Sequence, residues 1–160
     1  MRGMKKEKLS HAEENARAWM ETISEQVAAL EMDWERLEEL RDTDPADLDE
    51  DERVELSELV NTAGEFEDRE NVEDRIREEP LSVEVRSGWY SPGGDSFPEE
   101  FMILLSTGGP ALRIIGELDE NLQPIRCRLE HQDWGTPWTG WRDADRDVLE
   151  TWARQFYYGD

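Results

Sequence analysis

Three short apolar runs between residues 99 and 129 constrain the fold of this chain more than any other feature. The sequences Thr-Gly-Gly-Pro and Asp-Glu-Asn-Leu-Gln-Pro separate them, and both are rich in residues that favour bends. The first run, residues 101–105, is apolar at every position, which predicts a strand covered on both faces. The other two runs alternate, as strands with one buried face do. Their expected buried residues are Leu112, Ile114, Leu118, Ile125, Cys127 and Leu129.

The segments on either side of this β-meander complete the predicted sheet. Residues 81–90 favour a further strand, with Val83, Val85 and Trp89 directed inward. On the polar face, arginines and glutamates on neighbouring strands predict cross-strand ion pairs. A final helix is expected to begin at Asp143 or Asp145. The predicted core is a four-stranded antiparallel β-sheet closed by this C-terminal helix.

The N-terminal half carries a helical repeat. From His11 to about Arg41, apolar residues recur at alternating spacings of four and three, an unbroken seam over three heptads. Ser10 and Glu13 fit a capping box at its start. A single helix of about 30 residues would form a rod of roughly 45 Å, and its seam makes a homodimer plausible. The seam residues are Ala16, Met20, Ile23, Val27, Leu30, Trp34 and Leu37.

A second predicted helix follows an acidic break at residues 42–51, where Pro45 cannot continue a helix. It runs from Pro45 or Leu48 to Glu78, and the two helices are expected to pair as an antiparallel hairpin. The predicted fold class is α+β. Its parts are a flexible basic N-terminus at residues 1–10, an acidic helical hairpin at 11–79, and the sheet with its C-terminal helix at 80–160. The hairpin and the sheet are expected to form one compact unit.

Charge is the second strong constraint. The chain has 41 acidic and 18 basic residues, a formal net charge of −23. More than half of this excess lies in residues 42–79, which contain 17 acidic and four basic side chains. Such a surface repels nucleic acid and anionic membranes and attracts basic partners. We therefore expect no direct binding to nucleic acid and none to a membrane.

The acidic helices support the main functional hypothesis, which is imitation of nucleic-acid charge. Duplex DNA carries one negative charge per ~1.7 Å of axis, so about 45 Å of DNA holds about 26 charges, close to the whole excess of this chain. The alternative is a solvated face that only keeps the chain in solution. The residues expected to contact a basic partner are Glu35, Glu38, Glu39, Asp42, Asp44, Asp47, Asp49, Glu50, Asp51, Glu55 and Glu58.

Residues 131–141 form a predicted loop with three tryptophans, Trp134, Trp138 and Trp141. One interpretation is a lid that seals the sheet against the final helix. The other is an aromatic recognition patch, because tryptophan is a common anchor at protein interfaces. The alternative function is therefore a structural or adaptor module that uses this loop and the heptad seam for protein–protein contacts.

No motif indicates catalysis, a cofactor or a metal site. Residues 42–53 begin like a calcium loop but end in arginine where the bidentate glutamate belongs. Cys127 and His131 would lie about 13 Å apart along one strand, too far to share a metal ion. Acid–base chemistry could use two carboxylates, for example Asp133 with Glu130, but nothing fixes their geometry. We expect a non-enzymatic protein without a cofactor.

The expected setting is the cytoplasm. Cys127 is the single cysteine, so no internal disulfide can form. The basic N-terminus leads into no apolar segment typical of a signal peptide. No apolar run approaches the ~18 residues that a membrane span requires.

Residues 88–159 contain the segments WYSPG, PEEFMILLSTGGPA, QDWGTPWT and FYYG, and residues 15–19 read NARAW. In these segments the chain resembles a family of small acidic proteins of phages, prophages and plasmids, whose leading segment is similar to NARAW. The resemblance implies a mobile-element setting, in which acidic proteins often inhibit host restriction or CRISPR systems. Together with the charge, it predicts a binding protein that inhibits a basic nucleic-acid-binding protein or ribonucleoprotein complex of the host.

Overall fold

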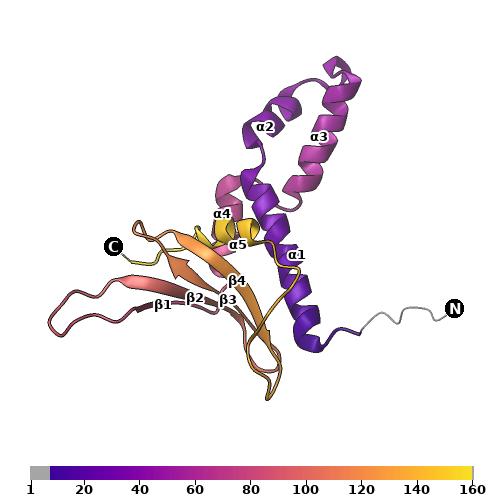
Figure 1. Cartoon of the computed structure of the whole chain (residues 1–160). Helices are drawn as coiled ribbons and strands as arrows, with labels where there is room; N and C mark the ends of the chain where they lie inside the picture. The colour runs from indigo at the N-terminus through magenta and orange to yellow at the C-terminus, as the bar shows by residue number, and fades with distance from the viewer. Residues whose placement is uncertain (1–7, 160) are drawn as a thin grey trace.

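The computed structural model describes residues 8–159, so most of the predicted flexible N-terminus lies outside the described residues. The described chain is α+β, with helices first, a sheet next and a last helix at the C-terminal end (Figure 1). The helices are α1 His11–Glu31, α2 Trp34–Asp42, the single 3₁₀ turn η1 Pro45–Asp47, α3 Glu50–Ala63, α4 Arg69–Glu78 and α5 Arg146–Ala153. The strands are β1 Ser82–Ser87, β2 Pro98–Ser106, β3 Ala111–Leu118, β4 Pro124–Gln132 and β5 Thr139–Gly140.

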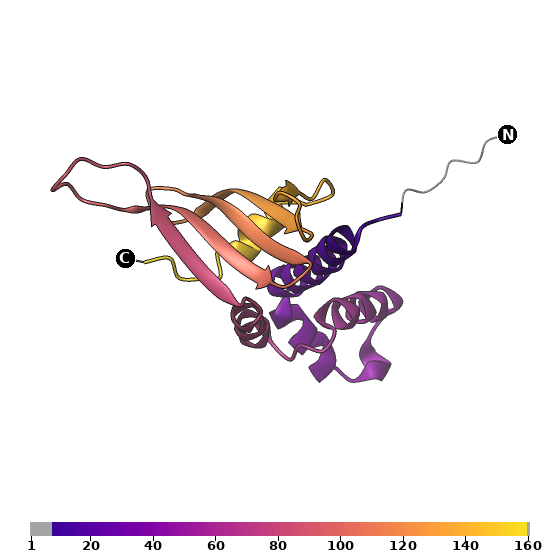
Figure 2. The same cartoon turned by 90° about the horizontal axis from the view of Figure 1, so that it is seen from below.

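The sheet is antiparallel with the strand order β1-β2-β3-β4-β5, so each strand pairs with its neighbours in sequence. The predicted meander is therefore confirmed. The fifth strand, which the sequence analysis missed, has only two residues and pairs with Glu130 and His131 of β4. Helices α1, α4 and α5 lie on one face of the sheet, and no described helix covers the other face (Figures 1 and 2). We call the uncovered side the outer face.

The hydrophobic core lies between the sheet and these helices. Phe101, Ile103, Ile114 and Leu129 from the strands are at most 2 % exposed. Trp152 of α5 is fully buried. The predicted seam of α1 packs into this core through Ala16, Met20, Ile23, Val27 and Leu30. The seam therefore faces the chain's own sheet.

The outer face corrects the expectation that residues 101–105 are covered on both sides. Phe101, Ile103 and Leu105 are buried, whereas Met102 and Leu104 between them are half-buried. The apolar run at these positions reflects an outer face that is partly apolar and that no helix within residues 8–159 covers (Figure 2). Apolar content alone cannot distinguish that case from a strand between two layers.

Two further inward predictions are wrong. Ile125 pairs with Glu117, which lies on the outer face, because a bulge at Arg126, with φ at +51°, reverses the alternation along β4. Trp89 is fully exposed, because β1 ends at Ser87. Val85 pairs with Phe101 and therefore lies on the core face as predicted, although its place on the edge strand leaves it 43 % exposed. Val83 is half-buried and packs against the core as expected.

The long first helix is broken at Met32 and Asp33. Met32 is extended, and the Asp33 carboxylate accepts a hydrogen bond of 2.9 Å from the Arg36 amide, which starts α2. The heptad spacing continues through this break because Trp34 still packs against the core. Leu37 and Leu40 are buried as well, outside the main core. The capping box of Ser10 and Glu13 is confirmed.

The second predicted helix is also divided, into η1, α3 and α4. Gly64, with φ at +55°, ends α3, and the Asp68 side chain caps α4. The chain still runs outward through α1 and α2 and returns through α3 and α4, so the predicted hairpin holds in outline (Figure 1). Its two limbs are bent and not straight rods.

Candidate interaction surfaces

The most charged part of the fold is a projecting arm, residues 33–63, which contains α2, η1 and α3. It extends from the end of α1 away from the sheet (Figure 1). Thirteen of its residues are acidic and three are basic, which gives a net charge of −10. Its small apolar centre includes Leu37, Leu40 and Leu48, which are at most 5 % exposed. We call this segment the acidic arm.

Short-range hydrogen bonds explain why so acidic a segment folds locally. The Asp44 carboxylate accepts from the Ala46 amide at 3.0 Å, and Pro45 occupies the first position of η1. Asp49 and Glu52 form a capping box at the start of α3. Carboxylates at helix N-termini satisfy free amides and interact favourably with the helix dipole. Asp44 and Asp49, both expected to contact a partner, therefore also stabilise the arm.

Arg36 joins the two helices of the arm. Its Nε lies 2.7 Å from Glu55 Oε1, and its other nitrogens lie 3.2 Å from Glu39 and 3.9 Å from Glu52. The hydrogen bond from Arg36 holds the pKa of the Glu55 carboxyl below its ordinary value of 4.5. Glu39 and Glu55, two of the residues expected to bind a partner, are therefore engaged inside the arm.

The remaining seven predicted contact residues are free. Their side chains are exposed, and none makes a hydrogen bond or ion pair to any residue within 8–159. Unpaired carboxylates on a projecting surface keep their full charge available to a partner. The seven are Glu35, Glu38, Asp42, Asp47, Glu50, Asp51 and Glu58.

The three tryptophans of residues 131–141 do not form one patch. Trp141 is 6 % exposed and belongs to the core, where its ring meets His131 edge-on at 6.2 Å. Trp138 is half-buried, and the Arg113 guanidinium lies 4.1 Å from its ring centre. Trp134 is 85 % exposed. It lies against Gly109, where an added Cβ would come within 1.9 Å of the ring. The lid interpretation therefore fits Trp141, and Trp134 alone presents most of its ring to solvent.

The outer face carries the predicted cross-strand ion pairs. Arg113 of β3 contacts Glu130 of β4 at 2.8 Å, and both side chains are at most 20 % exposed. Arg126 pairs with Glu117, and Arg86 pairs with Glu100. Glu130 is thus held by Arg113, which removes it as a free acid–base partner for Asp133.

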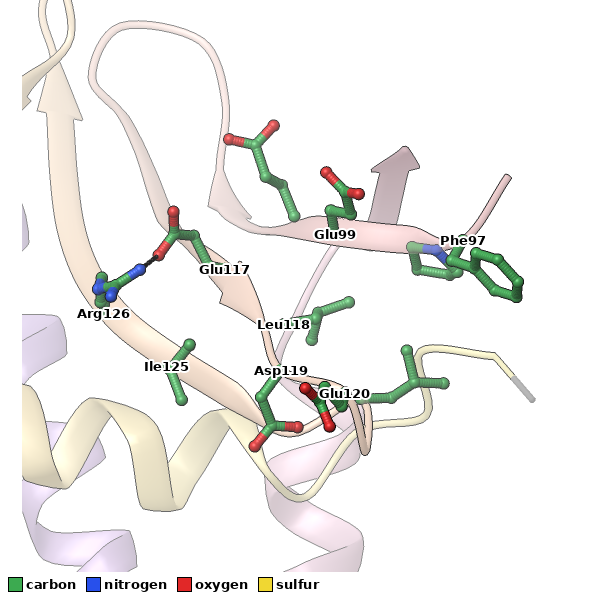
Figure 3. Close-up of a pocket in the computed structure, with 11 residues that line it drawn as sticks. Phe97, Glu99, Glu117, Leu118, Asp119, Glu120, Ile125 and Arg126 are labelled. Carbon is green, nitrogen blue, oxygen red and sulfur yellow. Dashed lines mark hydrogen bonds and ion pairs between the residues drawn. The ribbon is translucent and has the colours of Figure 1, made fainter. Parts of the chain in front are cut away.

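A hollow of about 780 Å³ lies at one end of the sheet, beside the turn that joins β3 and β4 (Figure 3). Leu118, Leu122 and Ile125 give it apolar surface, and five carboxylates line it. Asp119 is held by the amides of the following turn, at 2.8 and 2.9 Å. The described lining residues include no histidine, cysteine or hydroxyl side chain. The hollow therefore places several carboxylates beside apolar surface.

The remaining chemistry-bearing groups are buried or isolated. Burial raises the pKa of the Cys127 thiol to about 12, which leaves almost no thiolate near neutral pH. Within residues 8–159, no group of three or more histidine, cysteine or acidic side chains is arranged to hold a metal ion. No helix in the same range is long and apolar enough to cross a bilayer.

Sequence analysis missed the exposed aromatic loop between β1 and β2. In this loop Trp89, Tyr90 and Phe97 are 106, 57 and 65 % exposed, and the loop extends beyond the sheet (Figure 2). The signal was present in the sequence, because Ser91-Pro92-Gly93-Gly94 marks a long loop in which flanking residues need not alternate.

Comparisons with family models, curated proteins and solved structures found no match to this chain.

Proposed function

We propose that this chain is an acidic binding protein whose projecting arm occupies the basic channel of a nucleic-acid-handling complex. The observation that carries the proposal is the set of seven unpaired carboxylates on the acidic arm, which has a net charge of −10. In keeping with the family resemblance, the target is a host CRISPR or restriction complex in the cytoplasm. The chain inhibits it by competing with nucleic acid, not by catalysis.

Charge density supports this proposal better than total charge does. Helix α3 has 14 residues and is therefore about 21 Å long. Duplex DNA of about 21 Å carries about 12 charges, close to the net −10 of the whole arm. Because the chain breaks between α1 and α2, a single straight helix of about 45 Å cannot be the part that imitates DNA. The compact arm instead provides a similar charge density over a shorter length.

Reversal of four free carboxylates tests the proposal. The arm variant is Glu38→Lys, Asp42→Lys, Asp47→Lys and Glu58→Lys, which avoids helix-capping residues and the partners of Arg36. A matched control carries Glu21→Lys, Glu25→Lys, Glu78→Lys and Glu120→Lys, all exposed and unpaired within the described chain. Each reversal adds two positive charges, so both variants carry a net charge of −15 instead of −23.

The measurement is binding to, and inhibition of, purified CRISPR effector and restriction complexes, with duplex DNA as competitor. We expect the wild-type chain and the control to bind one such complex, with an affinity that falls steeply as the salt concentration rises. The affinity of the arm variant should be lower by at least about tenfold. Equal affinity of the two variants would contradict the proposal, because it would show that carboxylates on the acidic arm contribute no more to binding than carboxylates elsewhere. Circular dichroism of each variant confirms that the fold is kept.

The adaptor function remains the second candidate, and the exposure of Trp134 is the observation that favours it. Under that function, Trp134→Ala would weaken partner binding while the four arm reversals leave it unchanged. The same binding assay therefore separates the two candidates. Trp138 and Trp141 are poor choices for this test, because both also pack within the chain.

A further inference from the structure

We infer that this chain forms a homodimer in which β1 pairs antiparallel with β1 of a second copy. The two sheets would then join into one continuous sheet, with the core faces on the same side. This inference rests on the edge strand of the sheet and is independent of the function proposed for the acidic arm.

The two edges of the sheet differ. Beside β4, β5 pairs with Glu130 and His131, the Trp141 amide donates to the Leu129 carbonyl at 2.7 Å, and the Arg126 amide donates to Glu150. No described strand or loop pairs with the outer side of β1. An unpaired edge presents free amides and carbonyls, which a further strand can satisfy.

The open edge is also apolar. Of the nine large hydrophobic side chains that are exposed among residues 8–159, five lie in β1, directly before it or in the loop that follows it. They are Leu81, Val85, Trp89, Tyr90 and Phe97, with exposures from 43 to 106 %. Strand β1 contains neither lysine nor proline, and its two charged residues, Glu84 and Arg86, have opposite signs. Apolar exposure along and just beyond an open edge indicates an interface.

The charges of β1 select both the occupant and the register. Residues 84 and 86 lie on the outer face, because Glu84 pairs with Met102 and Arg86 with Glu100 of β2. An antiparallel pairing centred on Val85 places Glu84 opposite Arg86 of the second copy, and it does so twice by symmetry. It also places Val85 opposite its own copy and brings Leu81 towards Trp89 of the second copy.

Neighbouring registers are unfavourable. With the core faces on one side, the register can change only in steps of two residues. A centre at Glu84 would set two glutamates opposite each other, and a centre at Arg86 would set two arginines opposite each other. The sequence of β1 is therefore self-complementary in one register. Because Arg86 also contacts Glu100, the pairing would place that guanidinium between two carboxylates.

A charge-swap experiment tests the inference on the full chain. Glu84→Arg places two arginines opposite each other in the homodimer, and Arg86→Glu places two glutamates there. In a mixture of the two variants, both contacts become complementary again. The control is Glu21→Arg on the exposed side of α1, distant from β1 in the fold. Molar mass is measured by light scattering over about a hundredfold range of concentration, because dimer population depends on it.

We expect the wild-type chain and the Glu21→Arg control to reach twice the chain mass of 18.7 kDa at the upper concentrations. Each β1 variant alone should stay at the single-chain mass, with an unchanged circular dichroism spectrum, and the equimolar mixture should recover the doubled mass. A wild-type chain that stays single at every concentration would overturn the inference. So would a Glu84→Arg variant that dimerises as the wild type does, or a mixture that fails to associate.

Discussion

At the residue scale, Gln26 shows how one polar side chain connects three helices in the core. It is 4 % exposed, and its Oε1 accepts a 2.8 Å hydrogen bond from the Trp152 indole of α5. Its Nε2 donates to Glu79, just after α4, at 3.0 Å. Every buried polar side-chain atom in the described chain has a partner, and the Trp152 indole finds its acceptor in Gln26.

We predict that Gln26→Leu destabilises the chain by about 1–3 kcal/mol, because the buried Trp152 N–H loses its acceptor. Denaturant unfolding measures the change, and Gln123→Ala in an exposed turn is the control, expected to lie within about 0.5 kcal/mol of wild type. Adding Trp152→Phe removes the unpaired donor, so the two changes should cost less together than their sum. Full additivity would show that the hydrogen bond is not the cause.

The environment of a residue could be predicted from the sequence where neighbouring positions determine it. It could not be predicted where contacts with distant positions determine it. The capping box of Ser10 and Glu13 spans three residues, so its pattern is visible directly. Gln26 lies 126 positions from Trp152, and no local pattern predicts that contact. Ile125 was assigned to the wrong face because a bulge at Arg126 interrupts a regular alternation.

At the scale of elements, the type of structure was easier to predict than its continuity. The heptad spacing from Ala16 to Leu37 continues across the break at Met32, because the residues on either side still face apolar partners. The break depends on the Asp33 cap, and aspartate is ambiguous in a chain with so many acids. Strand β1 was predicted with an inward face, yet its edge position, a tertiary property, leaves Val85 exposed.

The contact between α2 and α3 gives a pH-dependent prediction. The Glu55 pKa is lowered below 4.5 by Arg36, so its stabilising contribution is complete above pH 4.5 and is lost as pH falls through the lower pKa of the folded state. We therefore expect Glu55→Gln to lower the unfolding midpoint near neutral pH. The difference from wild type should shrink steadily once the pH falls below 4.5.

Glu58→Gln is the matched control for this measurement, because Glu58 lies on the same helix without an ion pair in the described chain. Thermal unfolding followed by circular dichroism at a series of pH values supplies both curves. A Glu55→Gln difference that is constant with pH would mean that Arg36 does not stabilise the folded arm through this carboxylate.

At the scale of the whole molecule, the sequence predicted the net charge and the layered α+β arrangement. It did not predict that the acidic residues project away from the sheet. The net charge of −23 is a sum over residues and needs no fold. The projection of the acidic arm depends on the turns at Met32 and Gly64, which direct α2 and α3 away from the sheet. The acidic residues expected to bind a partner could therefore be identified from the sequence. Which of them are unpaired and which form ion pairs could be decided only from the position of Arg36 in the fold.

The balance between self-repulsion and ion pairs gives the last prediction, which concerns stability against salt. Most of the ion pairs in the described chain are exposed, and exposed pairs contribute only about 0–1 kcal/mol each. The acidic excess acts over the whole surface, and its range shortens from about 30 Å to about 3 Å as ionic strength rises from about 0.01 to about 1 M.

Repulsion should therefore outweigh the pairs, and we expect the thermal midpoint of unfolding to rise with sodium chloride. Neutralising the seven free carboxylates of the acidic arm to amides should raise the midpoint at low salt and flatten its salt dependence. Calorimetry at constant pH measures both effects. A midpoint that falls with salt would mean that the ion pairs of the outer face and of Arg36 outweigh the repulsion, and that the arm's charge is already balanced within the fold.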